Sequence, residues 1–249
     1  MNEFYAPFGI SLVLEEDIIK MYRTDTRIFQ NKPEVKRDIE GRIDIIWNRD
    51  EYYWYLDSKG IDKLSKTELK FTSDRTRDVL KEVLFGYIDA IIEEDLKSSI
   101  KNYIDSNDVF YSIPAATYYH HTYENGLLEH TVQVCELCNN VFTYLKEKTP
   151  IDKDILIAGA ILHDIGKINC YSCTDGVTTI TEIYKEQDHI INGVKIVSSN
   201  IRSEKIDKII HIIASHHQTK DMGSPVEPIY NEAWLVHVAD NLSANILGG

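Results

Sequence analysis

Residues 155–167 read ILIAGAILHDIGK, an apolar run that ends at the pair His163-Asp164, with Gly166 and Lys167 directly behind it. A carboxylate at the end of a buried helix is costly unless a cation or another partner compensates its charge. Imidazole and carboxylate groups are also common ligands of divalent transition ions. The stretch therefore predicts a buried helix that ends at a pair of metal ligands.

The residues behind this pair extend the prediction. Lys167 lies four residues after His163, which places both on one side of a helix, so we expect Lys167 to contact a phosphate oxygen. Gly166 lets the backbone turn or approach a ligand closely. The alternative is a buried His–Asp ion pair with Lys167 exposed.

Further histidines and one aspartate lie in other apolar stretches. His130 interrupts LLEHTVQV at residues 127–134, and each of the other stretches is expected to form a separate helix. Taken alone, a histidine of this kind also fits the core of a protein as a hydrogen-bonded side chain. Helix-borne imidazoles and carboxylates that converge in a bundle are, however, a common way to build a metal site. The candidates outside 155–167 are His130, His189, His216, His217 and Asp240.

The apolar spacing predicts a mainly α protein. Apolar residues recur every three or four positions from Val79 to Ile92, which indicates a helix from Asp74 onward with an N-cap in residues 72–74. Pro150 should end the helix that contains His130, and Asp152 should cap the next one. Asp175-Gly176 predicts a hairpin within residues 170–183. The remaining helices are expected at 127–148, 152–168, 188–200, 203–218 and 229–246.

The first part of the chain has a different pattern. Residues 42–56 are rich in Ile, Trp and Tyr, which favour strands. We therefore divide the chain into a small α+β region, residues 1–73, and a helical domain, residues 74–249.

Composition narrows the class of protein. The net charge of −13 argues against a binder that holds nucleic acid by clustered positive charge, but not against an enzyme whose metals hold the phosphate. No apolar run approaches the roughly 20 residues needed to span a bilayer, and the first residues lack the pattern of a signal peptide. We expect a cytoplasmic protein without a membrane partner.

Four cysteines form two Cys-x-x-Cys pairs, Cys135 with Cys138 and Cys170 with Cys173. The spacing is that of some zinc sites. The first pair lies within an apolar helical pattern, however, which favours buried thiols.

The order of the candidate ligands resembles a known family. His130, His163-Asp164 and Asp240 resemble the H…HD…D pattern of HD-domain phosphohydrolases. The segments FYSIPAA (110–116), GLLEHT (126–131) and ADNLSA (239–244) are similar to the branch of the YhaM-type 3′–5′ exoribonucleases. The resemblance covers roughly residues 75 to 247. One departure is Asn125, where that branch usually has the first of two glycines, and the chain also ends earlier than we expect for it.

The resemblance implies an HD-type helical bundle behind a degenerate oligonucleotide-binding (OB-like) barrel. It implies a first metal on His130, His163, Asp164 and Asp240. A second ion would be bridged by Asp164 and completed by His189, His216 and His217. Mixed nitrogen and oxygen ligands fit one or two transition ions, with Mn²⁺ expected first and Fe²⁺, Co²⁺, Ni²⁺ or Zn²⁺ as alternatives. The expected catalytic residues are Asp164, Lys167, His120 and His121, and the expected substrate-binding residues are Lys167, Tyr118 and Tyr123.

These inferences favour a metal-dependent phosphodiesterase that acts as a 3′–5′ exonuclease on short RNA or single-stranded DNA. A first alternative is an HD phosphohydrolase of nucleotides or cyclic nucleotides, which the acidic charge favours. A second alternative is a non-catalytic regulatory or binding module with the same fold.

Overall fold

The computed structural model describes residues 75–117, 120–174 and 177–247, apart from the side chains of residues 173–178, and the backbone of six strands before residue 57. The chain divides into two compact units, Met1–Phe71 and Thr72–Gly249.

The first unit contains two antiparallel three-stranded sheets. Strands β1 (Asn2–Ala6), β2 (Ile10–Glu15) and β3 (Ile18–Arg23) form one sheet in that order, and β4 (Glu34–Arg37), β5 (Ile43–Ile46) and β6 (Tyr53–Leu56) form the other. The strands predicted within residues 42–56 are β5 and β6, which pair with Ile45 opposite Trp54. The predicted barrel depends on connecting segments that lie outside the described residues, so it stays a prediction.

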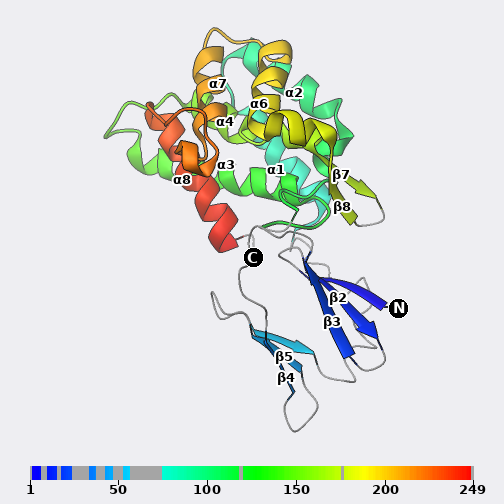
Figure 1. Ribbon diagram of the computed structural model, residues 1–249. Coiled ribbons are helices and arrows are strands. Elements are labelled where there is room, and N and C mark those ends of the chain that lie inside the picture. The colour runs from blue at the N-terminus through cyan, green and yellow to red at the C-terminus, as the bar shows by residue number, and fades with distance from the viewer. Residues whose placement is uncertain are drawn as a thin grey trace. The chain divides into compact units, whose positions relative to one another are not determined.

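The second unit is mainly helical, as the sequence predicts, and Figure 1 shows the small hairpin β7–β8 at one side of its helices. The predicted hairpin is present, with Tyr171 opposite Ile180. Its elements are α1 (Arg77–Asp89), α2 (Glu94–Asp105), η1 (Asp108–Tyr111), α3 (Gly126–Leu145), α4 (Lys153–Leu162), α5 (Lys167–Cys170), β7 (Tyr171–Thr174), β8 (Val177–Ile180), α6 (Glu182–Asn200), α7 (Ile206–Ser215), η2 (Lys220–Met222), α8 (Asn231–Leu242) and η3 (Ser243–Leu247).

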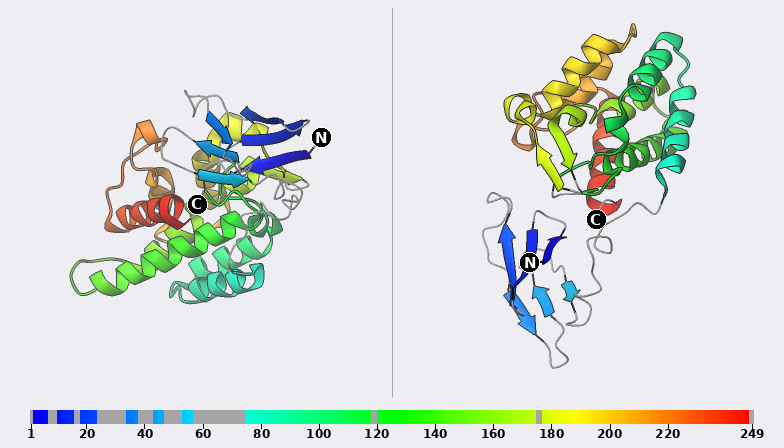
Figure 2. Two further views of the ribbon diagram at one scale, coloured as in Figure 1. Left: turned by 90° about the horizontal axis from the view of Figure 1, so that it is seen from below. Right: turned by 90° about the vertical axis from the view of Figure 1, so that its right-hand side faces the viewer.

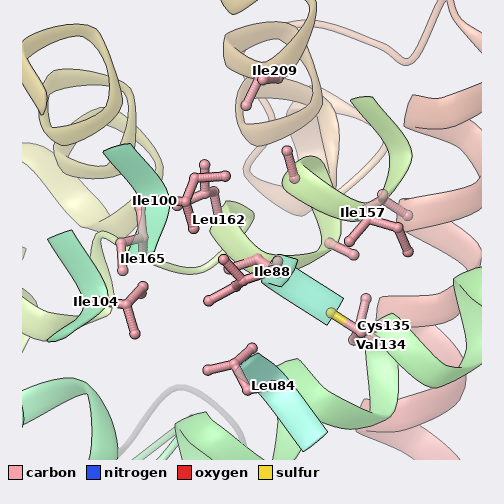
Figure 3. Close-up of a cluster of buried hydrophobic side chains, with 14 of the residues drawn as sticks. Leu84, Ile88, Ile100, Ile104, Val134, Cys135, Ile157, Leu162, Ile165 and Ile209 are labelled. Carbon is pink, nitrogen blue, oxygen red and sulfur yellow. The ribbon is translucent and has the colours of Figure 1, made fainter. Parts of the chain in front are cut away.

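Helix α4 lies at the centre of this unit. Every residue from Asp154 to Leu162 is buried, because α3, α7 and α8 all pack against it. A helix that is apolar on all sides belongs in such a place. The views in Figure 2 agree that α8 lies beside the long helix α3. Figure 3 shows the core side chains that α1, α2, α3, α4 and α7 contribute.

The helix ends differ in part from the sequence prediction. Asp152 caps α4 as predicted, since its carboxylate accepts hydrogen bonds from the backbone N–H groups of Asp154 and Ile155. The helix does not continue to residue 168. It ends at Leu162, and His163 is its C-cap. A turn then leads into the short α5, so the ligand pair lies at a helix end and in a turn.

The helix predicted from Asp74 is also corrected. Helix α1 begins at Arg77, and Thr76 is its N-cap rather than a residue within 72–74. The apolar rhythm runs past its end because Ile91 is buried in the connection to α2. Because the apolar spacing continues past the end of α1, the sequence pattern did not predict α2 as a separate helix.

The departure at Asn125 has a structural reason. Asn125 precedes α3 with φ 67° and ψ 8°, a left-handed conformation that glycine adopts freely and asparagine tolerates better than most residues. Gly126 is required for another reason, since a Cβ there would lie 2.0 Å from the backbone oxygen of His121. The entry to α3 thus holds the segment of His120 and His121 against the helix that carries His130.

The described cysteine side chains are buried thiols rather than metal ligands. Cys135 and Cys138 belong to the apolar core, and burial raises the pKa of both. Burial raises the pKa of Cys170 to about 12. Among the described residues, the groups of side chains that lie close enough to share an ion contain histidine and aspartate, and no cysteine.

Candidate metal centre

Asp164 lies between two groups of histidines. Its Oδ2 atom is 3.4 Å from Nε2 of His130 and 3.5 Å from Nε2 of His163. Its Oδ1 atom is 3.6 Å from Nε2 of His189 and 3.6 Å from Nε2 of His216. The turn after α4 therefore directs one carboxylate oxygen to each side.

The first cluster consists of His130, His163, Asp164 and Asp240. Nε2 of His130 lies 3.1 Å from Nε2 of His163 and 3.1 Å from Oδ1 of Asp240. Nε2 of His163 lies 3.8 Å from the same Asp240 oxygen. Ligands about 2.1 Å from a tetrahedral ion are about 3.4 Å from each other, so these separations suit one shared cation.

The second cluster consists of His189, His216 and His217 on the other side of Asp164. Ligand atoms of these three histidines lie within 4.8 Å of one another. Oδ1 of Asp164, Nε2 of His189 and Nε2 of His216 are buried without a hydrogen-bond partner among the described residues. Buried polar atoms are nearly always satisfied, so three such atoms facing one another fit the coordination of a divalent ion.

Backbone carbonyls fix the orientation of three of these imidazoles. Nδ1 of His163 donates to the carbonyl oxygen of Ala160 at 2.9 Å, and Nδ1 of His216 donates to that of Ile213 at 2.7 Å. Nδ1 of His217 donates to the carbonyl oxygen of Met222 at 3.1 Å. A neutral imidazole that donates through Nδ1 has its lone pair on Nε2, which is the form that binds a metal.

Side chains fix the other two imidazoles. Nδ1 of His130 is 2.8 Å from Oγ of Ser243, and Nδ1 of His189 is 2.5 Å from a carboxylate oxygen of Asp188. Asp188 holds that position at φ 57° and ψ 167°, a backbone conformation that is essentially confined to glycine.

The electrostatics favour ionised carboxylates at Asp164 and Asp240 and neutral imidazoles at His216 and His217. Burial opposes the charge of Asp164, but the Lys167 ammonium and the His163 imidazole outweigh it and hold its pKa well below the usual range. The pKa of Asp240 is lowered for the same kind of reason, with His130 and His163 as partners. Burial lowers the pKa of His216, and burial and neighbouring His216 lower the pKa of His217 to about 3.

His163 differs from these histidines. Burial again disfavours its charge, but the carboxylates of Asp164 and Asp240 outweigh burial and raise its pKa above the ordinary value. A proton therefore competes with a metal for His163 more strongly than for His216 and His217.

Lys167 lies beside the first cluster, but not on the same helix as His163. It starts the separate helix α5, and its Nζ atom is 2.5 Å from Oδ2 of Asp164. The side chain is buried, so the alternative of an exposed lysine is wrong. Lys167 adds a positive charge at the edge of the first cluster.

His120 and His121 are buried beside the first cluster. Their ligand atoms and that of His130 lie within 4.8 Å of one another. Burial and the neighbouring His130 lower the pKa of both, that of His121 to about 3. The hydroxyl of Tyr123 donates to the buried Glu129 carboxylate at 2.7 Å, and its ring contacts His121. Tyr118 lies outside the described residues.

Sequence reasoning missed several residues that support the ligands. The side chain of Asn192 donates to the carbonyl oxygen of Gly166 at 2.7 Å, and Nδ1 of His237 donates to that of His216 at 2.7 Å. Asn192 lies three residues after His189, and His237 lies three residues before Asp240. A search for polar residues one helical turn from each predicted ligand would have found both.

Residues 127–245 match the family model of the HD domain. These residues contain both clusters in the order H…HD…D. These residues therefore form an HD domain, and the buried histidine and aspartate clusters within it are consistent with a metal-dependent hydrolase.

Curated relatives place it more closely. The chain is 29% identical to a 3′–5′ exoribonuclease YhaM from Bacillus licheniformis over 178 residues, 68% of this chain and 53% of the relative. It is 27% identical to the YhaM of Listeria innocua over 199 residues, 75% and 60% of the two chains, and 33% identical to that of Oceanobacillus iheyensis over 178 residues. The chain spans between about half and three fifths of the length of these relatives. No solved structure matches it.

The described residues also bear on membrane association. None of their helices combines the length and the apolar character that crossing a membrane requires.

Proposed function

We propose that the protein is a two-metal 3′–5′ exonuclease that shortens RNA or single-stranded DNA from its 3′ end. The observation that carries the proposal is the Asp164 carboxylate, whose two oxygens face separate histidine clusters at 3.4–3.6 Å. Two ions bridged by one carboxylate suit in-line cleavage of a phosphodiester, because one clamp can stabilise both the attacking and the leaving oxygen.

The ligands would be His130, His163 and Asp240 for one ion and His189, His216 and His217 for the other, with Asp164 shared. Mixed nitrogen and oxygen donors favour a transition ion, and Mn²⁺ is our first choice. When bound, such ions lower the pKa of a coordinated water and offset negative charge on the phosphoryl oxygens. The chain orients the histidines for this purpose by occupying Nδ1 of each with a hydrogen bond.

The remaining predicted residues would act on the substrate. The Lys167 ammonium lies next to Asp164, where it can also attract a phosphate oxygen. His120 and His121 lie next to His130, where they can exchange a proton with the substrate or with water. The hydrogen bond of Tyr123 to Glu129 holds the Tyr123 ring against His121. We therefore assign Tyr123 a role in shaping the site, in addition to any stacking on a base.

The choice of nucleic acid over a small nucleotide rests on the relatives, which are named exoribonucleases. The net charge of −13 favours the alternative, a phosphohydrolase of nucleotides or cyclic nucleotides, because nothing in the charge balance would attract a long polyanion. Both candidate functions use the same two clusters and differ in the substrate that reaches these clusters.

The experiment is incubation of a 5′-labelled RNA or single-stranded DNA oligonucleotide with the protein and Mn²⁺. A 3′–5′ exonuclease gives a descending ladder of labelled products. Intact oligonucleotide together with turnover of a mononucleotide or a cyclic nucleotide would replace the nuclease with the alternative.

The matched variants are Asp164→Asn and Asp207→Asn. Asp164 lies between the clusters, whereas Asp207 lies exposed in the first turn of α7. We expect Asp164→Asn to lower the rate on the order of 10³-fold, since losing a single electrostatic contribution already costs roughly 10²- to 10³-fold. Asp207→Asn should retain the rate. Equal activity in both variants would remove Asp164 from the site.

A further inference from the structure

Two buried polar residues outside the clusters connect α3 to the end of α8. Gln133 lies three residues after His130, and Ser243 lies three residues after Asp240. Oγ of Ser243 donates to Oε1 of Gln133 at 2.7 Å, and Ser243 is fully buried. The same end of α8 thus contacts both nitrogens of His130, through Asp240 at Nε2 and through Ser243 at Nδ1.

The directions of these hydrogen bonds follow from the amide oxygen, which can only accept. Ser243 uses its single proton on Gln133, so its oxygen accepts from Nδ1–H of His130 at 2.8 Å. Nδ1 of His130 is thus held as a donor, and its Nε2 atom is directed toward the first cluster.

The same amide oxygen reaches a second histidine. Nε2 of His121 lies 3.0 Å from Oε1 of Gln133 and must donate to it. The neutral ring of His121 then accepts at Nδ1, and the nearest donor there is Nδ1–H of His120 at 3.0 Å. By this chain of bonds, the lone pair of His120 is on Nε2.

We propose that Gln133 is a positioning residue whose one carboxamide oxygen orients His130 through Ser243 and sets the tautomers of His121 and His120. The proposal rests on the proposed function in one respect, that His130 ligates a metal. It also defines the role of His120, whose Nε2 would accept a proton from water or a substrate hydroxyl instead of donating one to a leaving oxygen. A rotated Gln133 amide would reverse these hydrogen bonds and make Nδ1 of His130 an acceptor.

Tautomers can be measured directly on the full chain without metal or substrate. Long-range ¹H–¹⁵N correlation spectra of protein labelled with ¹⁵N-histidine distinguish a protonated Nδ1 from a protonated Nε2. We expect the proton on Nε2 in His121 and on Nδ1 in His120. A proton on Nδ1 of His121 would overturn the proposal.

Four variants separate the two branches. Ser243→Ala removes the partner of Nδ1 of His130 and should keep the tautomer of His121, whereas Gln133→Met should release that tautomer. Gln133→Glu keeps an oxygen acceptor and should retain it. Thr131→Val is the packing control, because the Thr131 hydroxyl is buried on the same helix without a hydrogen-bond partner among the described residues. Unchanged spectra in Gln133→Met would overturn the proposal.

Titration of the metal-free variants with Zn²⁺ provides an independent measurement. Supporting residues of this kind typically contribute 10- to 100-fold to metal affinity, so we expect losses of about that size in Ser243→Ala and Gln133→Met. Gln133→Glu and Thr131→Val should bind as the wild type does. Wild-type affinity in both Ser243→Ala and Gln133→Met would overturn the proposal. Because the spectra require no substrate, a wild type that fails the oligonucleotide assay would count against the proposed substrate alone.

Discussion

The first and second clusters share Asp164 but differ in how one histidine is held. In the first cluster, His163 donates to the nearby carbonyl of Ala160, but His130 depends on Ser243, which is 113 residues away in the chain. In the second cluster, His216 and His217 donate to carbonyl oxygens within five residues, and His189 bonds the adjacent Asp188.

This difference shows two ways to orient a ligand. The first cluster needs α8 to pack against α3, so it depends on the core as a whole. The second cluster is built from local bonds. Positive φ angles occur beside both clusters, at Asp188 (57°) and Gln218 (72°) and at His121 (44°) and Asn125 (67°). Such conformations typically cost about 1–3 kcal/mol each, and the surrounding fold must supply that energy.

Removal of the shared residue should have the largest effect. The wild type should bind about two Mn²⁺ ions per chain, as expected for a two-metal site. Asp164→Asn should lose both ions because each cluster loses a ligand, whereas Asp240→Asn should lose the ion of the first cluster alone. Elemental analysis after gel filtration measures the content. Two retained ions in Asp164→Asn would show that the clusters do not share this carboxylate.

A substitution at Gly166, which packs closely against the backbone of α6, should have the next largest effect. A Cβ at Gly166 would lie 1.9 Å from the backbone oxygen of His189 and 2.5 Å from the backbone nitrogen of Gly193. Gly166→Ala should therefore lower the free energy of unfolding by about 1–3 kcal/mol or more. Thermal or denaturant unfolding measures the change.

Gly86→Ala is the matched control for this substitution. Gly86 lies within α1, and a Cβ there would meet nothing within 4 Å. The substitution should stabilise the protein by roughly 0.5–1 kcal/mol, since alanine favours a helix. Equal destabilisation by both substitutions would contradict the close contact at Gly166.

Substitution of Asp188, the strained residue that contacts His189, should have a smaller and more selective effect. Asp188→Ala removes the acceptor of His189 and should weaken binding of one ion about 10- to 100-fold. Asp188→Gly should lose the same affinity and yet be more stable than Asp188→Ala, because glycine adopts the conformation without strain. Calorimetric titration and thermal unfolding measure the two quantities. Equal stability of the two variants would argue against strain at this position.

The pH dependence of the free energy of unfolding should also distinguish the two clusters. The pKa of His217 is lowered to about 3, so folding keeps it neutral while the unfolded chain takes up a proton near pH 6.5. Its contribution to stability is present above pH 6.5 and is lost as the pH falls toward 3, at up to about 1.4 kcal/mol per pH unit. His217→Gln should flatten this loss in denaturant unfolding of metal-free protein.

His163 should act in the opposite sense and in another window. Its pKa is raised, so its contribution is present below pH 6.5 and is lost as the pH rises through its folded pKa. His163→Gln should therefore change the slope above pH 6.5, where His217 contributes no slope. A change confined to the acid side in both variants would mean that the two clusters titrate alike.

Much of the site could be predicted because metal ligation depends on which residue types are present. An apolar run that ends in His163-Asp164 calls for a compensating charge, and histidines in other apolar stretches supply the partners. The helix that carries His130 and the cap at Asp152 also follow from local patterns. The end of α4 at Leu162 could not be predicted in this way, because the spacing of apolar residues does not show where a helix gives way to a turn that positions a ligand.

The sequence by itself determined a mainly helical unit and the order of its candidate ligands, since periodicity and residue chemistry act locally. The tertiary structure decided which oxygen of Asp164 faces which cluster, that Lys167 pairs with that carboxylate, and that Gln133 and Ser243 meet. These contacts join segments up to 110 residues apart. They arise from the packing of α3, α4, α6, α7 and α8, and no local pattern encodes the distances between helices.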